Sequence, residues 1–379
     1  MADEAYDVVV AGGGVIGLAC AWRLTQRGLR VAVVDPAPAG AATHAAAGML
    51  APVTEVKYGE EPLLELALES LRRYPGFVAE LEAQTGHVVG LRTEGTLLVA
   101  TDAGDRAMLA DLHDFQASLG LDVTMLTSRE ARALEPGLSP EIRAALLASS
   151  DHSVDNRLLA AALLAALGAA VMRDRVTFVE IADGAVHAVR LAEGGRLATS
   201  TVLLAAGPWS AQIDGIPESA RPPVRPVKGE ILRLRAHGHV ELPTRSIRGF
   251  VNGHEVYLVP RAHGELVVGA TMDDQGFDTA VRTGAVRELL RDARAILPLI
   301  DELELVEAIA GLRPGSPDNR PIIGAADGVS GLHIATGHFR NGVLLAPVTA
   351  DLVADEITGD GTSLAAWSVA SNRFGALSA

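Results

Sequence analysis

The sequence predicts an α/β protein of two domains, in which a domain with a parallel sheet is interrupted by a domain with an antiparallel sheet. Three observations favour this architecture. A strand, a glycine turn, a helix and a second strand occupy residues 7–35, short strands with turns dominate the middle of the chain, and a strand and a helix follow near its end. The length of 379 residues also exceeds one ordinary core.

The first elements form a βαβ unit. Residues 7–11 are an apolar, β-branched run typical of a buried strand, and three glycines interrupt it. A helix is expected from about Val15 to a stop at Gly28, and a second buried strand covers residues 31–34 and ends at Asp35. Because such a crossover joins parallel strands, the unit predicts a parallel sheet.

The next segments alternate between helix and strand. The Gly/Ala-rich residues 39–51 are expected to be a loop or a helix start that permits close approach. Thr127 and Glu130 have the spacing of a capping box before a short helix, and Asp155 is expected to cap another helix. Periodicity predicts helices at residues 62–81, 103–119 and 157–167, a strand at residues 95–101, and the start of a strand at the end of the apolar run 158–172.

The middle of the chain is rich in predicted strands. Short strands with glycine turns are expected over residues 176–206, and further elements are strands at 230–235, 256–260, 265–270 and 332–336 and helices at 281–296 and 343–357. Pro222, Pro223 and Pro226 indicate a connection between domains. We therefore predict a discontinuous dinucleotide-binding domain of residues 1–90, 150–220 and 310–379, and a substrate-binding domain of residues 91–149 and 221–309.

Composition excludes several classes of partner. The net charge of −15 opposes binding to nucleic acid or to anionic membranes. A single cysteine, Cys20, rules out a disulfide within the chain and a metal cluster held by thiolates, and no metal site is expected. Residues 1–6 are acidic, unlike a secretory signal, and the longest apolar run is shorter than the ~20 residues of a membrane span. A cytoplasmic protein is therefore expected.

The glycine turn at residues 12–17, G-G-G-V-I-G, matches the G-x-G-x-x-G fingerprint of Rossmann-like domains, after a strand and before a helix. Gly12 permits the tight turn, Gly14 lets backbone N–H groups approach a pyrophosphate, and Gly17 lets the helix pack on the strand. The helix N-terminus adds about half a positive charge, and Asp35 can accept hydrogen bonds from ribose hydroxyls. The turn predicts a dinucleotide but leaves NAD and FAD open.

Later motifs decide between these cofactors. They are A-A-A-G-M-L-A-P at 45–52, V-R-P-V-K-G-E at 224–230, Y-L-V-P-R at 257–261, V-V-G-A-T-M at 267–272, G-L-R-P-G-S-P-D-N-R-P-I-I-G at 311–324 and G-H-F-R-N-G-V-L-L-A-P at 337–347. In this order they resemble the D-amino-acid oxidase superfamily, and within it the glycine oxidases of thiamine biosynthesis. The resemblance covers nearly the whole chain and implies a Rossmann-like FAD-binding domain with an inserted substrate domain.

The resemblance also implies the reaction. A small amino acid such as glycine is oxidised to an imine and then a 2-oxo acid, molecular oxygen is reduced to hydrogen peroxide, and the imine supplies thiazole formation for thiamine. A homotetramer is implied as well. Two positions depart from the pattern: Asp35 replaces the usual glutamate, and His44, interpreted as an exposed loop histidine, stands where small polar residues are usual.

Four residues are expected at the substrate. Arg313, in a Gly-Leu-Arg-Pro-Gly turn, matches the family's carboxylate anchor, and its guanidinium suits a bidentate carboxylate pair. By the same resemblance Tyr257 could hydrogen-bond that carboxylate and Met272 could pack on the substrate side chain. Arg340, near the substrate in the family, stands at the start of the last helix, where a cation costs ~0.3–1 kcal/mol. A bound anion or the flavin edge is expected to offset that cost.

The resemblance implies a non-covalent FAD, since Cys20 in the first helix is badly placed for a covalent link. Backbone N–H groups of residues 341–344 are expected to face the N1–C2=O edge of the flavin and to stabilise negative charge there. Hydride transfer to the flavin needs no catalytic acid or base, so none is predicted. Beyond the fingerprint glycines and Asp35, the expected cofactor contacts are Val15, Ile16, Pro36, Thr43, Ala47, Gly48, Met49, Val176, Gly207, His338, Phe339, Arg340, Asn341, Gly342, Val343 and Leu344.

Two other functions stay open at this point. One is a sarcosine-type oxidase or a D-amino-acid dehydrogenase that passes electrons to a quinone or another acceptor. The other is a dinucleotide-binding module without catalytic activity. NAD(P)H is not an expected partner because no second G-x-G-x-x-G unit precedes a strand–helix pair, and the chain has no G-x-S-x-G motif for serine hydrolysis.

Overall fold

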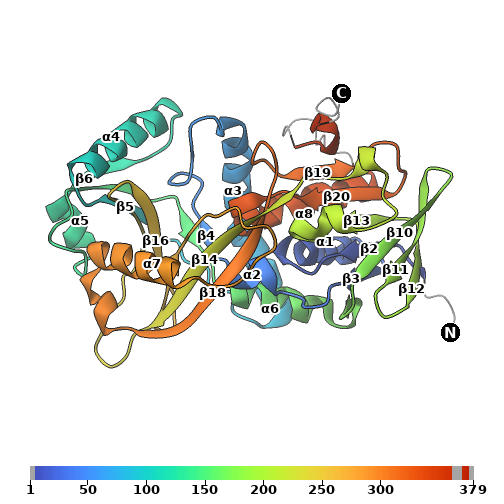
Figure 1. Ribbon diagram of the computed structural model, residues 1–379, viewed down its shortest axis with the longest axis horizontal. Coiled ribbons are helices and arrows are strands. Elements are labelled where there is room, and N and C mark those ends of the chain that lie inside the picture. Colours follow the sequence, from blue (N-terminus) through green and yellow to red (C-terminus); the bar gives the residue numbers. More distant parts are fainter. Residues whose placement is uncertain (1–4, 361–368, 375–379) are drawn as a thin grey trace.

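The computed structural model describes residues 5–360 and 369–374. The chain forms two large sheets, one of six strands and one of eight strands. The six-stranded sheet lies on the right of Figure 1 and the eight-stranded sheet on the left. The long strands β14 (Arg225–Arg235) and β18 (Glu304–Gly315) extend from the eight-stranded sheet toward the middle of the molecule. Within the described residues, no helix combines the length and the apolar character that a bilayer crossing requires.

The six-stranded sheet has the order β19-β20-β13-β2-β3-β9, and every neighbouring pair is parallel except β19 and β20. The predicted parallel sheet is therefore confirmed. Its strands come from distant parts of the chain: β2 (Val8–Ala11), β3 (Val31–Val34), β9 (Val171–Met172), β13 (Val202–Leu204), β19 (Ile322–Ala325) and β20 (Leu332–Thr336).

Both faces of this sheet are buried, which explains its continuous apolar strands. In β2, Val8 and Val10 face the helical layer, whereas Val9 and Ala11 face a four-stranded sheet. The helical layer consists of α1 (Val15–Gln26), α3 (Glu61–Thr85), α6 (Asn156–Leu167) and α8 (Gly342–Thr358). The four-stranded sheet consists of β1 (Ala5–Tyr6), β10 (Val176–Ala182), β11 (Ala185–Leu191) and β12 (Arg196–Thr199).

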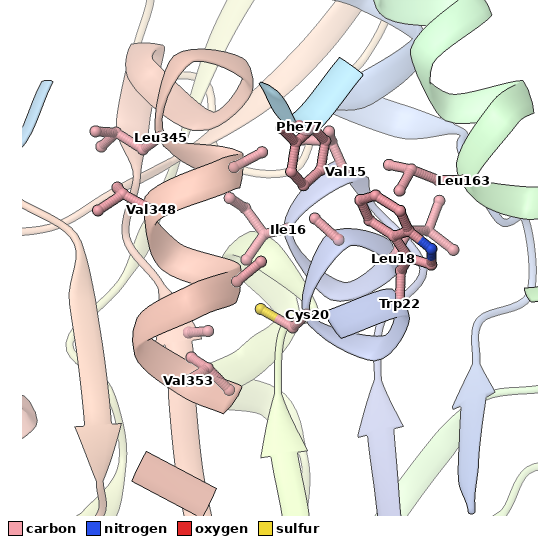
Figure 2. Close-up of a cluster of buried hydrophobic side chains, with 14 of the residues drawn as sticks. Val15, Ile16, Leu18, Cys20, Trp22, Phe77, Leu163, Leu345, Val348 and Val353 are labelled. Carbon is pink, nitrogen blue, oxygen red and sulfur yellow. The ribbon is translucent and has the colours of Figure 1, made fainter. Parts of the chain in front are cut away.

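Cys20 lies at the centre of the helical layer. Figure 2 shows its sulfur directed into the space between α1 and α8, in the same cluster as Trp22 and Phe77. The two rings make an edge-to-face contact with centroids 5.0 Å apart. Burial raises the pKa of the Cys20 thiol, so this thiol is a packing group rather than a nucleophile.

Local signals in this half of the chain predicted the elements well. Helix α1 ends just before Gly28, and the Asp155 carboxylate caps α6 by accepting from the backbone N–H groups of the next helical turn. The interpretation of His44 was wrong. His44 lies in α2 (Ala41–Ala45), is only partly exposed, and has its Nε2 3.4 Å from a carboxylate oxygen of Glu307. The Gly/Ala-rich stretch contains α2, which packs against β18, as expected of a segment that permits close approach.

The eight-stranded sheet has the order β18-β14-β17-β16-β15-β5-β7-β6. It is not purely antiparallel as expected, because β15 and β5 come from separate stretches of chain and pair in parallel. Its strands lie within residues 96–148 and 225–315, and a boundary between residues 309 and 310 would divide β18. The remaining strands are β5 (Thr96–Ala100), β6 (Thr124–Thr127), β7 (Ala144–Ala148), β15 (Ser246–Val251), β16 (His254–Pro260) and β17 (Glu265–Gly269).

Three features of this sheet differ from the sequence analysis. Arg313 is not in a turn but inside β18, paired with a residue of β14. Strand β15 was missed because Gly249 interrupts its apolar pattern. Packing requires this glycine, since a Cβ there would lie 2.3 Å from Ile296. Pro226, expected in a connection, lies inside β14 at a position that only β18 flanks, so its missing N–H costs no ladder bond to a second neighbour.

One face of the eight-stranded sheet packs on helices, and the other is left for a site. Leu232 and Leu258 contribute to a core with α7 (Thr283–Ile296) and α5 (Ser128–Leu134), while α4 (Ala103–Ser118) packs on β5 and β7. On the opposite face Ile231, Val259 and Val267 pack against Ala47. The segment that carries Ala47 continues into β4 (Met49–Leu50), which pairs with β8 (His152–Ser153).

Candidate active site

A cavity of about 750 Å³ has walls from both large sheets, a volume in the range of sites for small molecules and cofactors. The glycine turn and Asp35 line it, and so do Tyr257, Met272 and Arg313 from the eight-stranded sheet and the segment after it. The structure therefore brings the two groups of predicted residues to one cavity. Of the predicted cofactor contacts, those that line it are Gly12, Gly14, Val15, Ile16, Asp35, Pro36, Thr43, Ala47, Gly48, Met49, Val176, Gly207, His338, Phe339, Arg340, Gly342 and Val343.

The glycine turn is built for close approach. Gly12 has φ +115°, and a Cβ on it would lie 2.4 Å from the carbonyl oxygen of Ala205. A Cβ on Gly17 would lie 1.9 Å from the carbonyl oxygen of Gly12. Both positions therefore exclude any larger residue. Gly17 does not line the cavity, because it packs α1 against the turn, and its contact with a cofactor stays a prediction.

The N-terminus of α1 can accept an anion. No acidic side chain lies in its first turn and no side chain caps Gly14, while the N–H of Val15 donates to Thr43 Oγ1 at 2.9 Å. The other free N–H groups and the helix dipole are thus available to a phosphate. Asp35 is fixed beside them, since its carboxylate oxygens accept from the N–H groups of Gly13 and Ala37, each at 2.7 Å. Its spare lone pairs can accept from ribose hydroxyls.

The segment with the A-A-A-G-M-L-A-P motif is held from behind by buried polar side chains. Asn156 donates to the carbonyl oxygen of Thr43 at 2.7 Å, and Arg261 donates to the carbonyl oxygen of Ala47. Gly48 has φ +69°, and a Cβ on it would lie 2.0 Å from the carbonyl oxygen of Val154. The glycine in this motif is therefore required by packing, and the segment presents a fixed backbone to the cavity.

The start of α8 forms another wall. His338 is buried and bonded to Thr349 Oγ1 at 3.0 Å, and burial lowers the pKa of its imidazole to about 3, so this ring is neutral. Two predicted contacts do not line the cavity. The N–H of Asn341 already donates to the carbonyl oxygen of His338, and the Leu344 side chain is buried in the core of the helical layer. The free N–H groups that can face a ligand here belong to the turn that begins at Gly342.

Arg340 is largely buried, and an acid of the chain balances its charge. Its guanidinium forms an ion pair with Glu60, and both side chains are largely buried. The negative charge that the sequence analysis expected from a bound group is thus supplied by the chain itself. The sequence analysis did not identify this partner, because Glu60, at the start of α3, is remote in sequence from the last helix.

Arg313 lies in a different electrostatic setting. Its Nη1 donates to the carbonyl oxygens of Thr271, at 3.1 Å, and Lys228, at 3.4 Å, and no carboxylate lies within 4.0 Å of it in residues 5–360 and 369–374. Its guanidinium rests over Gly229, where a Cβ would lie 2.3 Å from it. A partly buried guanidinium without an acidic partner is suited to an anionic ligand.

Tyr257 and Met272 lie close to this cation. The Tyr257 hydroxyl passes over Gly269, where a Cβ would lie 2.4 Å from it. Burial raises the pKa of Tyr257, so its phenol remains a hydrogen-bond donor. Met272 is 55% exposed and lines the cavity, so it is not the sheet-core residue that its pattern alone would suggest.

The sequence analysis missed six charged residues in the cavity wall. Arg175 and Asp214 are two of them, and the other four, Glu55, Lys57, Arg248 and Glu255, are connected by ion pairs. Arg248 Nη1 lies 2.7 Å from Glu55, and Arg248 Nη2 lies 3.1 Å from Glu255. The alternation of Glu255 and Tyr257 on β16 was a usable signal, because residues two apart share a face of a strand. Arg248 offered no such signal, since its strand was not predicted.

Comparisons with known proteins relate nearly the whole chain to one family. A family model described as FAD dependent oxidoreductase (DAO) matches residues 7–356. Glycine oxidase of Geobacillus kaustophilus (strain HTA426) is 36% identical over 356 residues, which cover 92% of this chain and 92% of that protein. A crystal structure of glycine oxidase from Geobacillus kaustophilus matches with a TM-score of 0.87 and 34% identity, covering 96% of this chain and 98% of that one. The bifunctional protein ThiO/ThiG of Synechocystis sp. (strain ATCC 27184 / PCC 6803 / Kazusa) is 34% identical over 377 residues, 97% of this chain and 54% of that longer protein.

Proposed function

The chain belongs to the family of FAD-dependent oxidoreductases, and from this premise we propose that it oxidises the carbon–nitrogen bond of glycine or another small amino acid to an imine. The resemblance inferred from the motifs, the fold class and the FAD cofactor are confirmed. The observation that carries the proposal is the uncompensated guanidinium of Arg313 in the cavity wall.

Arg313 is proposed to hold the substrate carboxylate. Arg175, Arg248 and Arg340 line the same cavity. Arg175 directly precedes Val176, one of the predicted cofactor contacts, and Arg248 and Arg340 each already face a carboxylate of the chain, whereas Arg313 donates to backbone carbonyl oxygens. A bidentate pair would fix the orientation of the amino acid as well as its position. Tyr257, with its phenol protonated, is placed to donate a further hydrogen bond to the same carboxylate.

The residues present also fit FAD. We propose that the α1 N-terminus and Asp35 hold the adenosine diphosphate part, and that the Ala47–Met49 backbone and the first turn of α8 border the flavin ring. Helix α8 has no acidic residue in its first turn and no side-chain cap, so its N–H groups and dipole are free to stabilise negative charge there. When bound, FAD supplies the capacity to accept two electrons from the substrate.

The side chains contribute binding and orientation rather than proton transfer. His338 is the buried imidazole of the wall, and with a pKa of about 3 and a bond to Thr349 it is not a proton carrier near neutral pH. The substrate amine is therefore proposed to lose its ammonium proton to solvent before the α-carbon is oxidised. Holding the carboxylate on Arg313 supplies the orientation that makes the remaining step effectively unimolecular.

The proposal includes the physiological setting that the motifs imply. Molecular oxygen takes the electrons and leaves as hydrogen peroxide, the imine reaches water or thiazole formation for thiamine, and the enzyme is a cytoplasmic homotetramer. The 34% sequence identity to a bifunctional ThiO/ThiG protein supports the link to thiamine. A dehydrogenase with another acceptor is the less favoured candidate.

The test is a panel of glycine, sarcosine and D-alanine with the yellow holoenzyme. We expect bleaching of the flavin absorbance without air and peroxide release in air for at least one of the three. Bleaching without peroxide would replace the oxidase by a dehydrogenase. No bleaching with any amine would leave only a dinucleotide-binding module, and the proposal would be abandoned.

A further inference from the structure

The charged side chains around Arg248 form one continuous chain of ion pairs. Lys57 Nζ lies 3.0 Å from Glu255 Oε1, Glu255 Oε2 lies 3.1 Å from Arg248 Nη2, and Arg248 Nη1 lies 2.7 Å from Glu55 Oε1. Arg248 and Glu55 are 9% and 13% exposed, whereas Lys57 and Glu255 are 41% and 45% exposed. This series of ion pairs therefore runs from the interior of the cavity wall toward solvent.

This chain lies beside the proposed substrate position. Arg248 is directly opposite Tyr257 in the β15–β16 ladder, and Glu255 is on the same face of β16 as Tyr257. Burial raises the pKa of Tyr257, and the positive charges of both Arg313 and Arg248 oppose that rise. Tyr257 is thus within the electrostatic reach of both guanidinium groups, one free and one paired.

The charges of these four side chains cancel, and Glu255 is the acid that both cations contact. Without its carboxylate, Lys57 would lose this ion pair, Arg248 would keep its ion pair with Glu55, and the place of one carboxylate would be open beside Arg248. We infer that Arg248 and Lys57 form a second carboxylate-binding position that Glu255 masks, so that the cavity accepts amino acids with one carboxylate and rejects dicarboxylic ones. The inference rests on the proposed function in one respect, that Arg313 holds the first carboxylate.

Like-charge repulsion is the physical reason for the rejection. A ligand that places one carboxylate on Arg313 and extends a second one past Tyr257 meets Glu255 and Glu55, whose charges are already matched. Bringing a third carboxylate to this pair leaves one negative charge without a partner, which is an effective way to exclude a competing ligand. A ligand with a single carboxylate leaves the ion pairs intact.

The experiment compares the holoenzyme with its Glu255→Gln variant by ligand-induced changes in flavin absorbance, which need no turnover. The probes are acetate, malonate, succinate and glutarate. The quantity is the ratio of the dissociation constant of each dicarboxylate to that of acetate. We expect the ratio for the best-fitting dicarboxylate to fall at least tenfold in Glu255→Gln, and oxidation of D-aspartate or iminodiacetate to rise relative to D-alanine.

Two further variants make the test specific. Glu304→Gln removes an acid of similar exposure that pairs with His237 and does not line the cavity, so the ratio should stay at its original value. Adding Lys57→Met to Glu255→Gln restores the charge balance and is expected to remove most of the gain. FAD content and melting temperature are measured for each protein.

The inference is overturned if the original protein binds a dicarboxylate as tightly as acetate, or if Glu255→Gln leaves every ratio unchanged. It is also overturned if Glu304→Gln produces the same gain, or if the gain persists in full after Lys57→Met is added. Because the ratios come from binding, they decide the matter even if no amine is oxidised. Failure of the proposed function would be seen separately, in the amine panel.

Discussion

Replacing Arg313 by alanine tests the residue on which the proposed function depends most. The guanidinium lies over Gly229 and donates to backbone carbonyl oxygens, and it forms no ion pair with an acid among the described residues, so its removal leaves no such acid without a partner. Arg313 is also absent from the parts of the cavity wall proposed to hold FAD. The variant should therefore fold and remain yellow while its substrate binding is impaired.

The magnitude follows from the bonds that are lost. A hydrogen bond to a charged group contributes ~1.5–3 kcal/mol, and a bidentate pair loses two of them. Tyr257 remains as a donor and limits the loss, so we take about 3 kcal/mol, which corresponds to roughly a 100-fold rise in KM at 1.4 kcal/mol per tenfold change. Arg313→Lys keeps the charge but not the fork, and a rise of about tenfold is expected.

The assay is steady-state kinetics with the best amine of the panel, monitored by peroxide or by an artificial acceptor, together with titration by acetate. Both KM for the amine and the dissociation constant of acetate should rise in the same order, alanine above lysine. The FAD-to-protein ratio is the control for folding. A KM and an acetate affinity that stay within twofold of the original values in Arg313→Ala would refute the assignment of the anchor.

Four further predictions concern the cofactor site and stability. Acid precipitation should release all yellow colour into the supernatant, because Cys20 is buried in the core and does not line the cavity; a yellow pellet would contradict non-covalent FAD. Gly12→Ala should yield colourless or insoluble protein, since its Cβ would lie 2.4 Å from a carbonyl oxygen, and a normal FAD content would count against the proposed turn. Glu60→Gln should lower stability by about 3 kcal/mol in urea unfolding, because it leaves Arg340 without its ion pair in a largely buried site, whereas an unchanged midpoint would show that the pair contributes nothing. Burial raises the pKa of Asp151 to about 7, above its value in the unfolded chain, so this group holds more protons in the folded state and its contribution to stability falls as pH rises from about 4 to 7; Asp151→Asn should flatten the dependence of the melting temperature on pH, and identical slopes would contradict the shift.

The parts of the site that could be predicted from sequence are the local ones. The turn at Gly12 was readable because its strand, glycines and helix are consecutive in the chain, and the same is true of α8 and the capping of α6 by Asp155. Arg313 was proposed as a site residue through its motif, yet the conformation predicted for it was wrong, because the neighbouring glycines and proline suggested a turn. In β18 those residues serve instead to bring the strand close to α2 and to β14.

The parts that could not be predicted depend on pairing between distant segments. Arg248 becomes a neighbour of Tyr257 only through the register of β15 with β16, and it meets Glu55 only because the segment after β4 folds onto that sheet. Arg340 meets Glu60 in the same way, across most of the chain. No periodicity in the sequence encodes such contacts, so the charge balance of the cavity, which decides which cation is free, required the structure.

The position of Arg313 also depends on buried side chains on the other face of β14. Lys228 and Glu230 alternate with Gly229, so they point away from the cavity and are almost completely buried. Lys228 Nζ lies 3.5 Å from Glu230 and donates to the carbonyl oxygen of Ala280, while Glu230 accepts from the N–H of Arg282 at 2.7 Å. These bonds hold residues 271–282 against β14, and this segment supplies the Thr271 carbonyl oxygen that orients Arg313. A buried acid and a buried base thus hold in place the segment whose carbonyl oxygen orients Arg313, and the guanidinium in front of the strand stays available for the carboxylate of a ligand.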